Sequence, residues 1–417
     1  MFFPLSVKDV VRDPFDPASR IDREISDRNR RLALGTCLKN DFQSLSAAMV
    51  VATGKGKHLR ILDAVTTNSP LPEFTTRLLR EAVFGQKPPT MAELQTLQTD
   101  IALAQAAAVE QLKSSAGKYV DRLLVVSVTQ PDLALSKHHK DSQWPISLSA
   151  PHVLAEHTGL SVVSSFANRD ILAGGTGRGL DALPAWILFA DRNCRIASKN
   201  RILFCIGQTA RAYYLPASDG IDSDLPEIRI ASCDGLNRFD SIRHTDRQAT
   251  ELDDLQKLNL NGIDLELDSE QLSQLIRSRK ISKSDFVRSS IVNIVNDISR
   301  LIKTQSSPSA NVDEIVVQAD PELIGTFANQ FRRAWAATNV YDGFGWDISN
   351  SHLQPILAAT LGILSIDQLP ANIPWLTGAY SQKVLGTITP GSPANWRQLL
   401  REMADFQPPV MRLRDAV

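Results

Sequence analysis

Short apolar segments separated by polar turns dominate the start of the chain, and they predict β-strands. Three of them span residues 32–36, 47–52 and 59–65, with the turn Gly54-Lys55-Gly56 before the last. Strands this short, joined by brief polar turns, are typical of an antiparallel meander. We therefore expect the fold to begin with three antiparallel strands near residue 31.

Two segments with the periodicity of amphipathic helices come next. The first spans residues 74–84, and the second runs from Thr90 towards Lys113 with apolar residues at helical spacing. This spacing places the apolar side chains on one face of a helix. An apolar strand follows at 122–128. The order of three strands, helix and strand is typical of half an actin-like, or ribonuclease-H-like, α/β domain.

The second half of the chain repeats this order. Its predicted elements are strands at 201–207, 212–215 and 227–231, a helix from residue 282, a strand at 313–317 and a helix at 321–335. We therefore predict an α/β protein with a two-lobed actin-like (ribonuclease-H-like) fold and an interlobe cleft. The predicted domains are an N-terminal extension at 1–30, a first lobe at 31–195, and a second lobe at 196–417 that ends in a C-terminal helical segment.

The charge balance argues against nucleic acid and membranes as partners. Lysine plus arginine number 45, and aspartate plus glutamate number 46. A nearly neutral chain has no basic field to attract nucleic acid or an anionic membrane surface. No apolar run reaches the length of a membrane span, and the apolar start MFFPLSV is shorter than the core of a signal peptide. We expect a cytoplasmic protein.

The cysteines indicate neither a disulfide framework nor a metal site. They lie far apart, without a Cys-x-x-Cys pair or a histidine at ligand spacing, at Cys37, Cys194, Cys205 and Cys233. This usage fits a reducing compartment. His138-His139 lies in a polar stretch, and a solvated loop explains it more simply than a pair of metal ligands. No residue is therefore assigned to a metal.

Residues 157–180 combine an apolar strand with a glycine-rich loop. Arg169 and Asp170 precede Gly174, Gly175 and Gly177. Glycine lets backbone N–H groups approach a ligand closely, because it has no side chain and accepts positive φ. A donor and a carboxylate at the mouth of this loop are suited to hold a polar substrate. The alternative is a tight turn with a surface ion pair, in which the glycines serve the backbone and Asp170 caps a helix.

Four segments match, in order, the motifs of one family. Gly35-Thr36-Cys37-Leu38 stands where that family has Ser-Gly-Thr-Ser-Leu-Asp-Gly, and PHVLAEHTG at 151–159 is similar to its Pro-x-x-Ile-Ala-Glu-x-Thr-Gly. The stretch 157–180 is similar to Val-Val-x-Asp-Phe-Arg-x-x-Asp-x-Ala-x-Gly-Gly-x-Gly-Ala-Pro-Leu. Residues 369–390 are similar to Pro-Gly-Asn-x-Pro-x-Val-Thr-Gly-Ala…Val-Leu-Gly-x-Ile-x-Pro. The chain thus resembles the anhydro-N-acetylmuramic acid kinases, ATP-dependent sugar kinases of the actin-like superfamily.

The resemblance implies a sugar-kinase fold, ATP and Mg²⁺ as cofactors, and a cell-wall amino sugar as substrate. The family opens the 1,6-anhydro ring of its sugar with water and phosphorylates the 6-oxygen. The residues implied to bind nucleotide are Gly35, Thr36 and Gly207. The residues implied to bind sugar are Ser127, Gln130, Asp170, Gly174 and Gly175. The resemblance also implies a homodimer.

The loops that should contact nucleotide depart from the family's pattern. Lys39-Asn40 replaces an Asp-Gly pair, and Gln208 replaces a glycine whose backbone should approach phosphate. Gln318-Ala319-Asp320 replaces a Gly-Gly-Gly and brings a carboxylate to the expected phosphates. Glycine makes up only 21 of 417 residues, below the average of about 7%, as expected if glycine-rich loops have been lost.

The position of the family's base departs as well. Without gaps, Ser232 aligns with the expected aspartate, and Asp234 reaches that position only if the chain slips by two residues. Two classes of function therefore stay open. In the first, a protein with a kinase fold has lost catalysis and acts as a binding or regulatory protein. In the second, a divergent sugar kinase uses Asp234 or Asp170 as its catalytic base.

Overall fold

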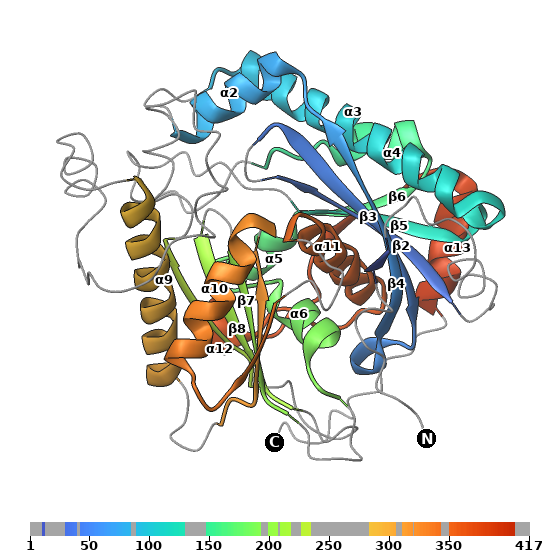
Figure 1. Ribbon diagram of the computed structural model, residues 1–417. Coiled ribbons are helices and arrows are strands. Elements are labelled where there is room, and N and C mark those ends of the chain that lie inside the picture. The colour runs from blue at the N-terminus through green and yellow to red at the C-terminus, as the bar shows by residue number, and fades with distance from the viewer. Residues whose placement is uncertain are drawn as a thin grey trace. The chain divides into compact units, whose positions relative to one another are not determined.

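The chain folds into two compact units in the computed structural model (Figure 1). Unit 1 comprises Met1–Leu188 and Ser351–Val417, and unit 2 comprises Phe189–Asn350. The residues that the structure describes are 11–12, 30–39, 42–84, 89–129, 147–192, 199–206, 209–217, 227–234, 283–305, 311–319, 321–342 and 350–404.

Unit 1 is built on a seven-stranded sheet with the order β1-β4-β3-β2-β5-β6-β12. Its strands are β1 (Val11–Arg12), β2 (Arg31–Leu38), β3 (Ser44–Thr53), β4 (Arg60–Pro70), β5 (Leu123–Thr129), β6 (Ser161–Ser164) and β12 (Thr387–Thr389). β2, β3 and β4 form the predicted antiparallel meander, and β5 and β6 continue the sheet parallel to β2. β1 lies along the outer edge of β4, so part of the predicted N-terminal extension is an arm on the sheet.

Helices cover both faces of this sheet. They are α2 (Glu73–Phe84), α3 (Met91–Ala116), α4 (Pro151–Thr158), α5 (Phe166–Leu172), α6 (Ala182–Phe189), α11 (Asn350–Ile366), α12 (Pro374–Thr377) and α13 (Pro393–Ala404), with short 3-10 helices at Gly56–His58 and Gly117–Arg122. α3 and α4 lie together on one face, and α11 lies on the other (Figure 1). Because successive strand residues point to opposite faces, neighbours in β2 contact different helices.

Local sequence explains where several of these helices begin and end. Thr90 and Glu93 form a capping box at the start of α3, in which each side chain accepts a hydrogen bond from the other residue's N–H. α4 and α12 both begin with a proline and end before a glycine with positive φ, at Gly159 and Gly378. α11 is buried around most of its circumference, as expected for a helix of almost uniformly apolar sequence.

Unit 2 is built on a five-stranded sheet with the order β11-β10-β7-β8-β9. Its strands are β7 (Arg201–Ile206), β8 (Thr209–Leu215), β9 (Arg229–Asp234), β10 (Glu314–Gln318) and β11 (Asn339–Asp342). β7, β8 and β9 form a second antiparallel meander, and β10 is parallel to both β7 and β11.

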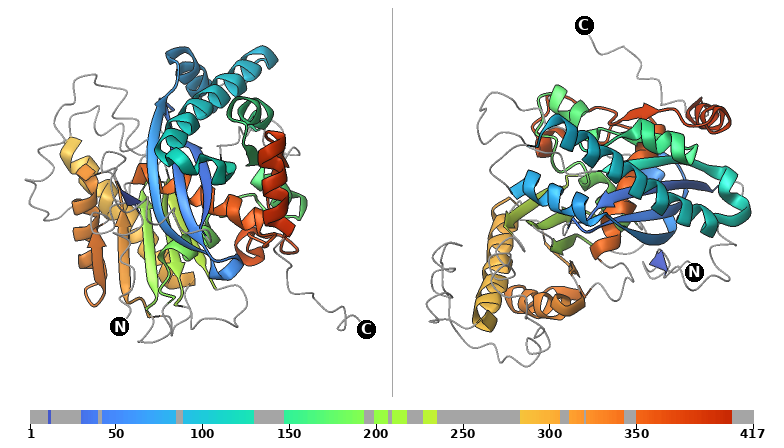
Figure 2. Two further views of the ribbon diagram at one scale, coloured as in Figure 1. Left: turned by 90° about the vertical axis from the view of Figure 1, so that its right-hand side faces the viewer. Right: turned by 90° about the horizontal axis from the view of Figure 1, so that it is seen from above.

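Two helices, α9 (Lys283–Gln305) and α10 (Pro321–Ala334), lie side by side along one face of this sheet (Figure 2). The predicted apolar face of α9 is buried at Ile291, Ile294, Val295 and Ile298. The ring of Phe204 in β7 lies 5.3 Å from that of Phe327 and 4.8 Å from that of Phe331, measured between centroids. The aromatic cluster therefore joins α10 to the centre of the sheet.

An ion-pair cluster marks the start of β10. The buried Glu314 accepts hydrogen bonds from Lys199 Nζ at 2.5 Å and from Arg201 Nε at 2.6 Å. Burial by itself raises the pKa of Glu314, but the hydrogen bonds and charges of the two cations outweigh it and hold that pKa below its ordinary value. The same contact raises the pKa of Lys199.

The two sheets share one topology. In each, the first strand of a three-stranded meander pairs on its other side with a parallel strand, and a further strand continues the sheet. This is the ribonuclease-H-like order, and its repetition confirms the predicted α/β class and the actin-like sugar-kinase fold. The interlobe cleft stays a prediction, since each unit is described by itself.

The end of the chain corrects the predicted domain boundary. Residues after 350 belong to unit 1, whereas the sequence pattern predicted a second lobe that spans all of 196–417. β12 pairs with β6, and the buried Asn395 of α13 accepts a hydrogen bond from Ser161 N–H at 2.7 Å. Its amide also donates to the carbonyls of Leu123 and Leu124. These contacts join segments more than 200 residues apart, and no local pattern announces them.

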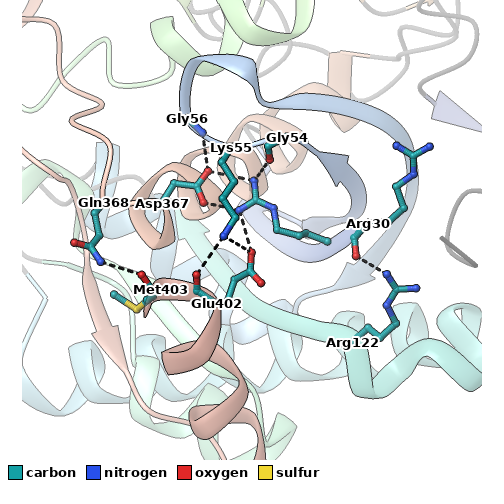
Figure 3. Close-up of polar contacts among 10 residues, drawn as sticks. Arg30, Gly54, Lys55, Gly56, Arg122, Asp367, Gln368, Glu402 and Met403 are labelled. Atoms are coloured by element: carbon teal, nitrogen blue, oxygen red, sulfur yellow. Dashed lines mark hydrogen bonds and ion pairs between the residues drawn. The ribbon is translucent and has the colours of Figure 1, made fainter. Parts of the chain in front are cut away.

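A buried ion pair, the Arg31–Asp367 clasp, holds the end of α11 to the start of β2. Figure 3 shows Asp367 beside Gly54, Lys55 and Gly56. The two side chains of the clasp are 7% and 1% exposed, and two guanidinium–carboxylate contacts of 2.5 and 3.2 Å join them. Asp367 also accepts from Gly56 N–H at 2.9 Å. Beside the clasp, the more exposed Lys55 and Glu402 form an ion pair at 3.2 Å.

Candidate functional site

Asp170 is the centre of the site that the sequence singled out. It lies near the end of α5 and is fully buried. Its Oδ1 accepts a hydrogen bond from Asn372 Nδ2 at 2.9 Å, and its Oδ2 accepts one from Gly177 N–H at 2.9 Å. Its backbone carbonyl accepts from Gly175 N–H at 2.9 Å. Asp170 therefore anchors the glycine-rich loop, and it is neither half of a surface ion pair nor a helix cap.

The glycines of this loop make room for neighbouring side chains. A Cβ on Gly174 would lie 2.4 Å from Cε2 of Tyr380, and one on Gly175 would lie 2.2 Å from Oδ2 of Asp170. Gly174 and Gly177 also have φ of +85° and +70°, in the region that side chains rarely adopt. The loop thus needs glycine for its own packing, whether or not a ligand binds.

A segment of the C-terminal region completes the site. Asn372 precedes α12, and its Oδ1 accepts from Lys383 N–H at 2.5 Å. The segment also pairs with the glycine-rich loop through the backbone, since Thr176 N–H donates to Thr377 O at 2.8 Å and Tyr380 N–H donates to Ala173 O at 2.7 Å. The polar network around Asp170 therefore joins two segments that are far apart in the sequence.

Apolar and aromatic side chains are exposed on the outer side of these two segments. Tyr380 is 91% exposed, Leu172 at the end of α5 is 68% exposed, and Trp375 in α12 is 52% exposed. Arg169 is exposed as well. Exposed aromatic groups beside polar ones are typical of binding surfaces. What this region presents to solvent is thus the aromatic surface, while the carboxylate lies inside.

The predicted phosphate-binding residues Gly35 and Thr36 lie within β2, where both are buried. A Cβ on Gly35 would lie 2.0 Å from the carbonyl oxygen of Pro355 in α11. On the opposite face, Thr36 Oγ1 accepts a hydrogen bond from Gln105 Nε2 of α3 at 3.0 Å. Both residues are therefore in contact with helices, Gly35 with α11 and Thr36 with α3. As placed, they do not fit an open phosphate-binding loop. Their predicted role in nucleotide binding stays a prediction.

Ser127 is the register partner of Gly35 in the neighbouring strand β5. It is fully buried, and among the residues that the structure describes its Oγ has no hydrogen-bond partner. The hydroxyl points at α11, where a Cβ on Gly362 would lie only 1.6 Å from Oγ. Ser127 and Gly35 thus share one face of the sheet and admit the same helix, which accounts for the small size of both residues.

Other predicted site residues lie partly or wholly outside the described residues. Gln130 and Gly207 do so entirely. Asp234 is the last residue of β9, paired with Thr209, and its side chain lies outside the described residues. Its predicted role as base stays a prediction. Among the residues that the structure describes, no three His, Cys, Asp or Glu side chains are grouped to hold a metal ion.

Sequence reasoning missed Asn372, which is the partner of Asp170. The residue occupies the asparagine of the Pro-Gly-Asn motif in the C-terminal segment, so a signal was present. That motif identified the segment, but only the fold brings Asn372 Nδ2 to 2.9 Å from Asp170 Oδ1.

Within the described ranges, no helix has the length and apolar character needed to cross a membrane.

Comparison with protein families gives a match over the first half of the chain. A family model described as anhydro-N-acetylmuramic acid kinase matches residues 43–209, a region that begins after β2 and contains β3, β4, β5 and the Asp170 loop. The match ends at Thr209, the first residue of β8, so most of unit 2 lies beyond the matched region.

Several relatives carry the same description. The anhydro-N-acetylmuramic acid kinase of Gloeobacter violaceus is 28% identical over 197 residues, which are 45% of this chain and 48% of the relative. That of Bacillus thuringiensis subsp. konkukian is 24% identical over 269 residues, which are 58% of this chain and 69% of the relative. The chain thus spans about half the length of the first relative and about two thirds of the second.

Among solved structures, the activator of 2-hydroxyisocaproyl-CoA dehydratase from Clostridium difficile, with bound ADPNP, is similar with a TM-score of 0.41. The identity is 11%, and the match covers 80% of this chain and 94% of that structure. Component A of the Acidaminococcus fermentans (R)-2-hydroxyglutaryl-CoA dehydratase also has a TM-score of 0.41, at 8% identity, covering 80% of this chain and 99% of that one.

Proposed function

We propose, since the chain belongs to the anhydro-N-acetylmuramic acid kinase family as a divergent member, that it binds a cell-wall amino sugar without transferring phosphate to it. In this proposal the protein acts as a binding or regulatory protein of amino-sugar metabolism. The family's own activity depends on ATP, so the proposal turns on whether the nucleotide-binding groups are still available.

One observation carries the proposal. Gly35 and Thr36 match the family's first phosphate-binding motif. In this chain α11 packs against Gly35 on one face of β2, and Gln105 of α3 donates a hydrogen bond to Thr36 on the other. The next residues of that motif are Lys39-Asn40 in place of Asp-Gly, so the carboxylate that would orient Mg²⁺ is missing from it. A loop without its carboxylate, and with its glycine packed against a helix, offers little to a metal–nucleotide complex.

The Asp170 network supports retention of a ligand-binding surface. Its loop and the C-terminal segment are held together by hydrogen bonds, and they present Tyr380 and Trp375 to solvent. The face of an aromatic ring suits the apolar C–H face of a pyranose, and polar groups beside it suit hydroxyls. We expect an amino sugar to lie against this aromatic surface.

A divergent active kinase is the second candidate, and one observation favours it. Both carboxylate oxygens of Asp170 accept a hydrogen bond from a fixed donor, as a catalytic base must be held in one orientation. In that case Asp170 abstracts the proton of the attacking water, which requires the glycine-rich loop to open, because the carboxylate is fully buried as placed. The two candidates differ in their need for nucleotide.

Titration calorimetry and a product assay separate them. We expect the purified protein to bind 1,6-anhydro-N-acetylmuramic acid and to show neither MgATP binding nor a phosphorylated product by mass spectrometry. Tyr380→Ala should weaken sugar binding, whereas Phe74→Ala, at a 51% exposed aromatic residue in α2, should not. Micromolar MgATP binding together with phosphorylated sugar would establish the second candidate instead.

A further inference from the structure

Residues 372–383 form a compact loop whose two ends are joined. At this base, Ala371 N–H donates to the carbonyl of Lys383 at 3.1 Å, and Lys383 N–H donates to Asn372 Oδ1 at 2.5 Å. Ala371 and Asn372 are both buried, so the base is fixed in unit 1. A compact surface loop with its ends close together is an Ω-loop, a class that is frequently functional. We call residues 372–383 the Ω-loop.

The tip of the Ω-loop, residues 374–382, has hydrogen bonds of its own. It contains α12, in which Thr377 N–H donates to Ile373 O at 3.0 Å. After the helix, Ala379 N–H donates to Thr377 Oγ1 at 3.3 Å. These bonds are internal to the Ω-loop and its base, so the tip can move as a unit without losing them.

The tip contacts the glycine-rich loop through its backbone and through one ring. Thr176 N–H donates to Thr377 O at 2.8 Å, and Tyr380 N–H donates to Ala173 O at 2.7 Å. The ring of Tyr380 lies over Gly174, where a Cβ would come within 2.4 Å of it, yet the side chain is 91% exposed. Water can replace hydrogen bonds at the surface, so each contributes little net stability. This contact is therefore easier to separate than the buried base.

We propose that the tip of the Ω-loop is a lid, which opens away from the glycine-rich loop while the base stays closed. Asn372 belongs to the base, so Asp170 keeps its hydrogen bond from Asn372 Nδ2 when the lid opens. Opening frees the N–H of Thr176 and the carbonyl of Ala173, which the lid occupies in the closed state. It also gives solvent a route towards Asp170, which is fully buried in the closed state. The lid controls access to the loop whichever ligand the protein binds.

Hydrogen–deuterium exchange of the unmodified full chain tests the lid directly. The amides of Thr176 and Tyr380 are bonded across the lid, whereas those of Gly177 and Lys383 have acceptors that stay in place when it opens. If the lid opens as a unit, the first two amides have matching protection factors, about a hundredfold lower than those of the other two. Fragmentation mass spectrometry resolves the four amides.

A thiol on the inner side of the lid gives an independent measurement. Thr377 is 1% exposed in the lid, and the matched control Thr360 is fully buried in α11. Without denaturant, iodoacetamide should alkylate the cysteine of Thr377→Cys at least about tenfold faster than that of Thr360→Cys, which needs a larger unfolding. Peptide mass spectrometry separates the introduced cysteine from the four natural ones.

Removal of the ring over Gly174 should favour the open lid. In the Thr377→Cys background, Tyr380→Ala should raise the alkylation rate about three- to tenfold, because only the closed state has the ring contact. Phe74→Ala removes a ring of 51% exposure from α2 and should leave the rate unchanged.

Three results would overturn the proposal. The first is protection at Thr176 and Tyr380 that is unequal, or that equals the protection of Gly177 and Lys383. The second is equal alkylation of Thr377→Cys and Thr360→Cys, and the third is an alkylation rate that Tyr380→Ala leaves unchanged. The exchange measurement uses the unmodified protein, so it decides the question even if Thr377→Cys does not fold.

Discussion

Exchange of the two side chains at the centre of the Asp170 network is the sharpest test of how this site is built. In Asp170→Asn, the side chain keeps its size but has one acceptor oxygen in place of two. Asn372 Nδ2 and Gly177 N–H both need an acceptor there, and each lies 2.9 Å from a different carboxylate oxygen. One of the two donors must therefore lose its partner in this variant.

The expected magnitude follows from this geometry. Asp170 is fully buried, so water does not replace the lost contact, and a buried donor without a partner destabilises the fold by about 1–3 kcal/mol. Loss of the negative charge also weakens the remaining hydrogen bond. We expect Asp170→Asn to lower the free energy of unfolding by about 2 kcal/mol. Asn372→Asp should lower it more, because it brings two buried carboxylates together.

The double variant Asp170→Asn, Asn372→Asp should recover much of this loss. The new asparagine donates to the new aspartate and still accepts from Gly177 N–H, and the aspartate still accepts from Lys383 N–H. Only the weaker contact from Asn372 Nδ2 to the Ser381 carbonyl, at 3.1 Å, has no substitute. A positive coupling between the two sites is therefore expected in a double-mutant cycle.

Urea unfolding gives the free energies, and hydrogen–deuterium exchange of residues 173–179 reports the loop itself. We expect faster exchange at the Gly177 amide in Asp170→Asn and slower exchange again in the double variant. If Asp170→Asn unfolds within about 0.5 kcal/mol of the unmodified protein and the loop exchanges as before, Asp170 is not the anchor of the loop. Additive effects of the two substitutions would show that the pair is not coupled.

Three further predictions concern the Arg31–Asp367 clasp, the glycine-rich loop at Gly174 and the dependence of stability on acidic pH through Glu314. Asp367→Asn should destabilise the protein by about 3 kcal/mol in urea unfolding, because the buried Arg31 loses its charged partner and keeps the Glu402 carboxylate at 3.7 Å and the Gly54 carbonyl. Glu402→Gln should change the stability by at most about 1 kcal/mol, and equal losses would contradict this. Gly174→Ala should destabilise by about 1–3 kcal/mol, since its Cβ meets Tyr380 at positive φ, and adding Tyr380→Ala should recover part of that if the ring is the obstacle. Glu314 has a lowered pKa in the fold, so its contribution is present above the unfolded pKa and is lost as the pH falls through the folded pKa; Glu314→Gln should therefore flatten the fall in urea stability between neutral pH and about pH 3, and an unchanged slope would refute this.

Strand and helix positions followed from the sequence because their periodicity is local. α3 and α9 show the helical period of a half-buried element, and the strands β2 and β3 are short apolar runs, buried on both faces and bounded by polar turns. The bounds of α11 did not follow from the sequence, which indicated only a C-terminal helical segment, because a helix buried around its circumference has no polar face to give it a period. The return of residues after 350 to unit 1 rests on contacts such as that of Asn395 with Ser161, which no local pattern encodes.

The sequence was enough to predict which residues form the candidate site, but not what each of them does there. The sequence contains Gly174, Gly175 and Asp170, and their spacing indicated a loop that approaches a ligand. It does not contain what fills the space beside each glycine, and the structure places the ring of Tyr380 and the carboxylate of Asp170 there. The role of Asn372 depends on a contact between residues 202 positions apart, so it needed the fold.

The roles that the fold gives to these residues decide which of them are informative about activity. Gly35, Gly174, Gly175 and Asp170 are each required by packing or by internal hydrogen bonds. A descendant that no longer handles nucleotide would keep them, because their loss destabilises the fold, so their agreement with kinase motifs is evidence of common ancestry and says little about catalysis. Departures from the family's motifs, such as Lys39-Asn40 in place of Asp-Gly, are therefore more informative about activity than agreements with them.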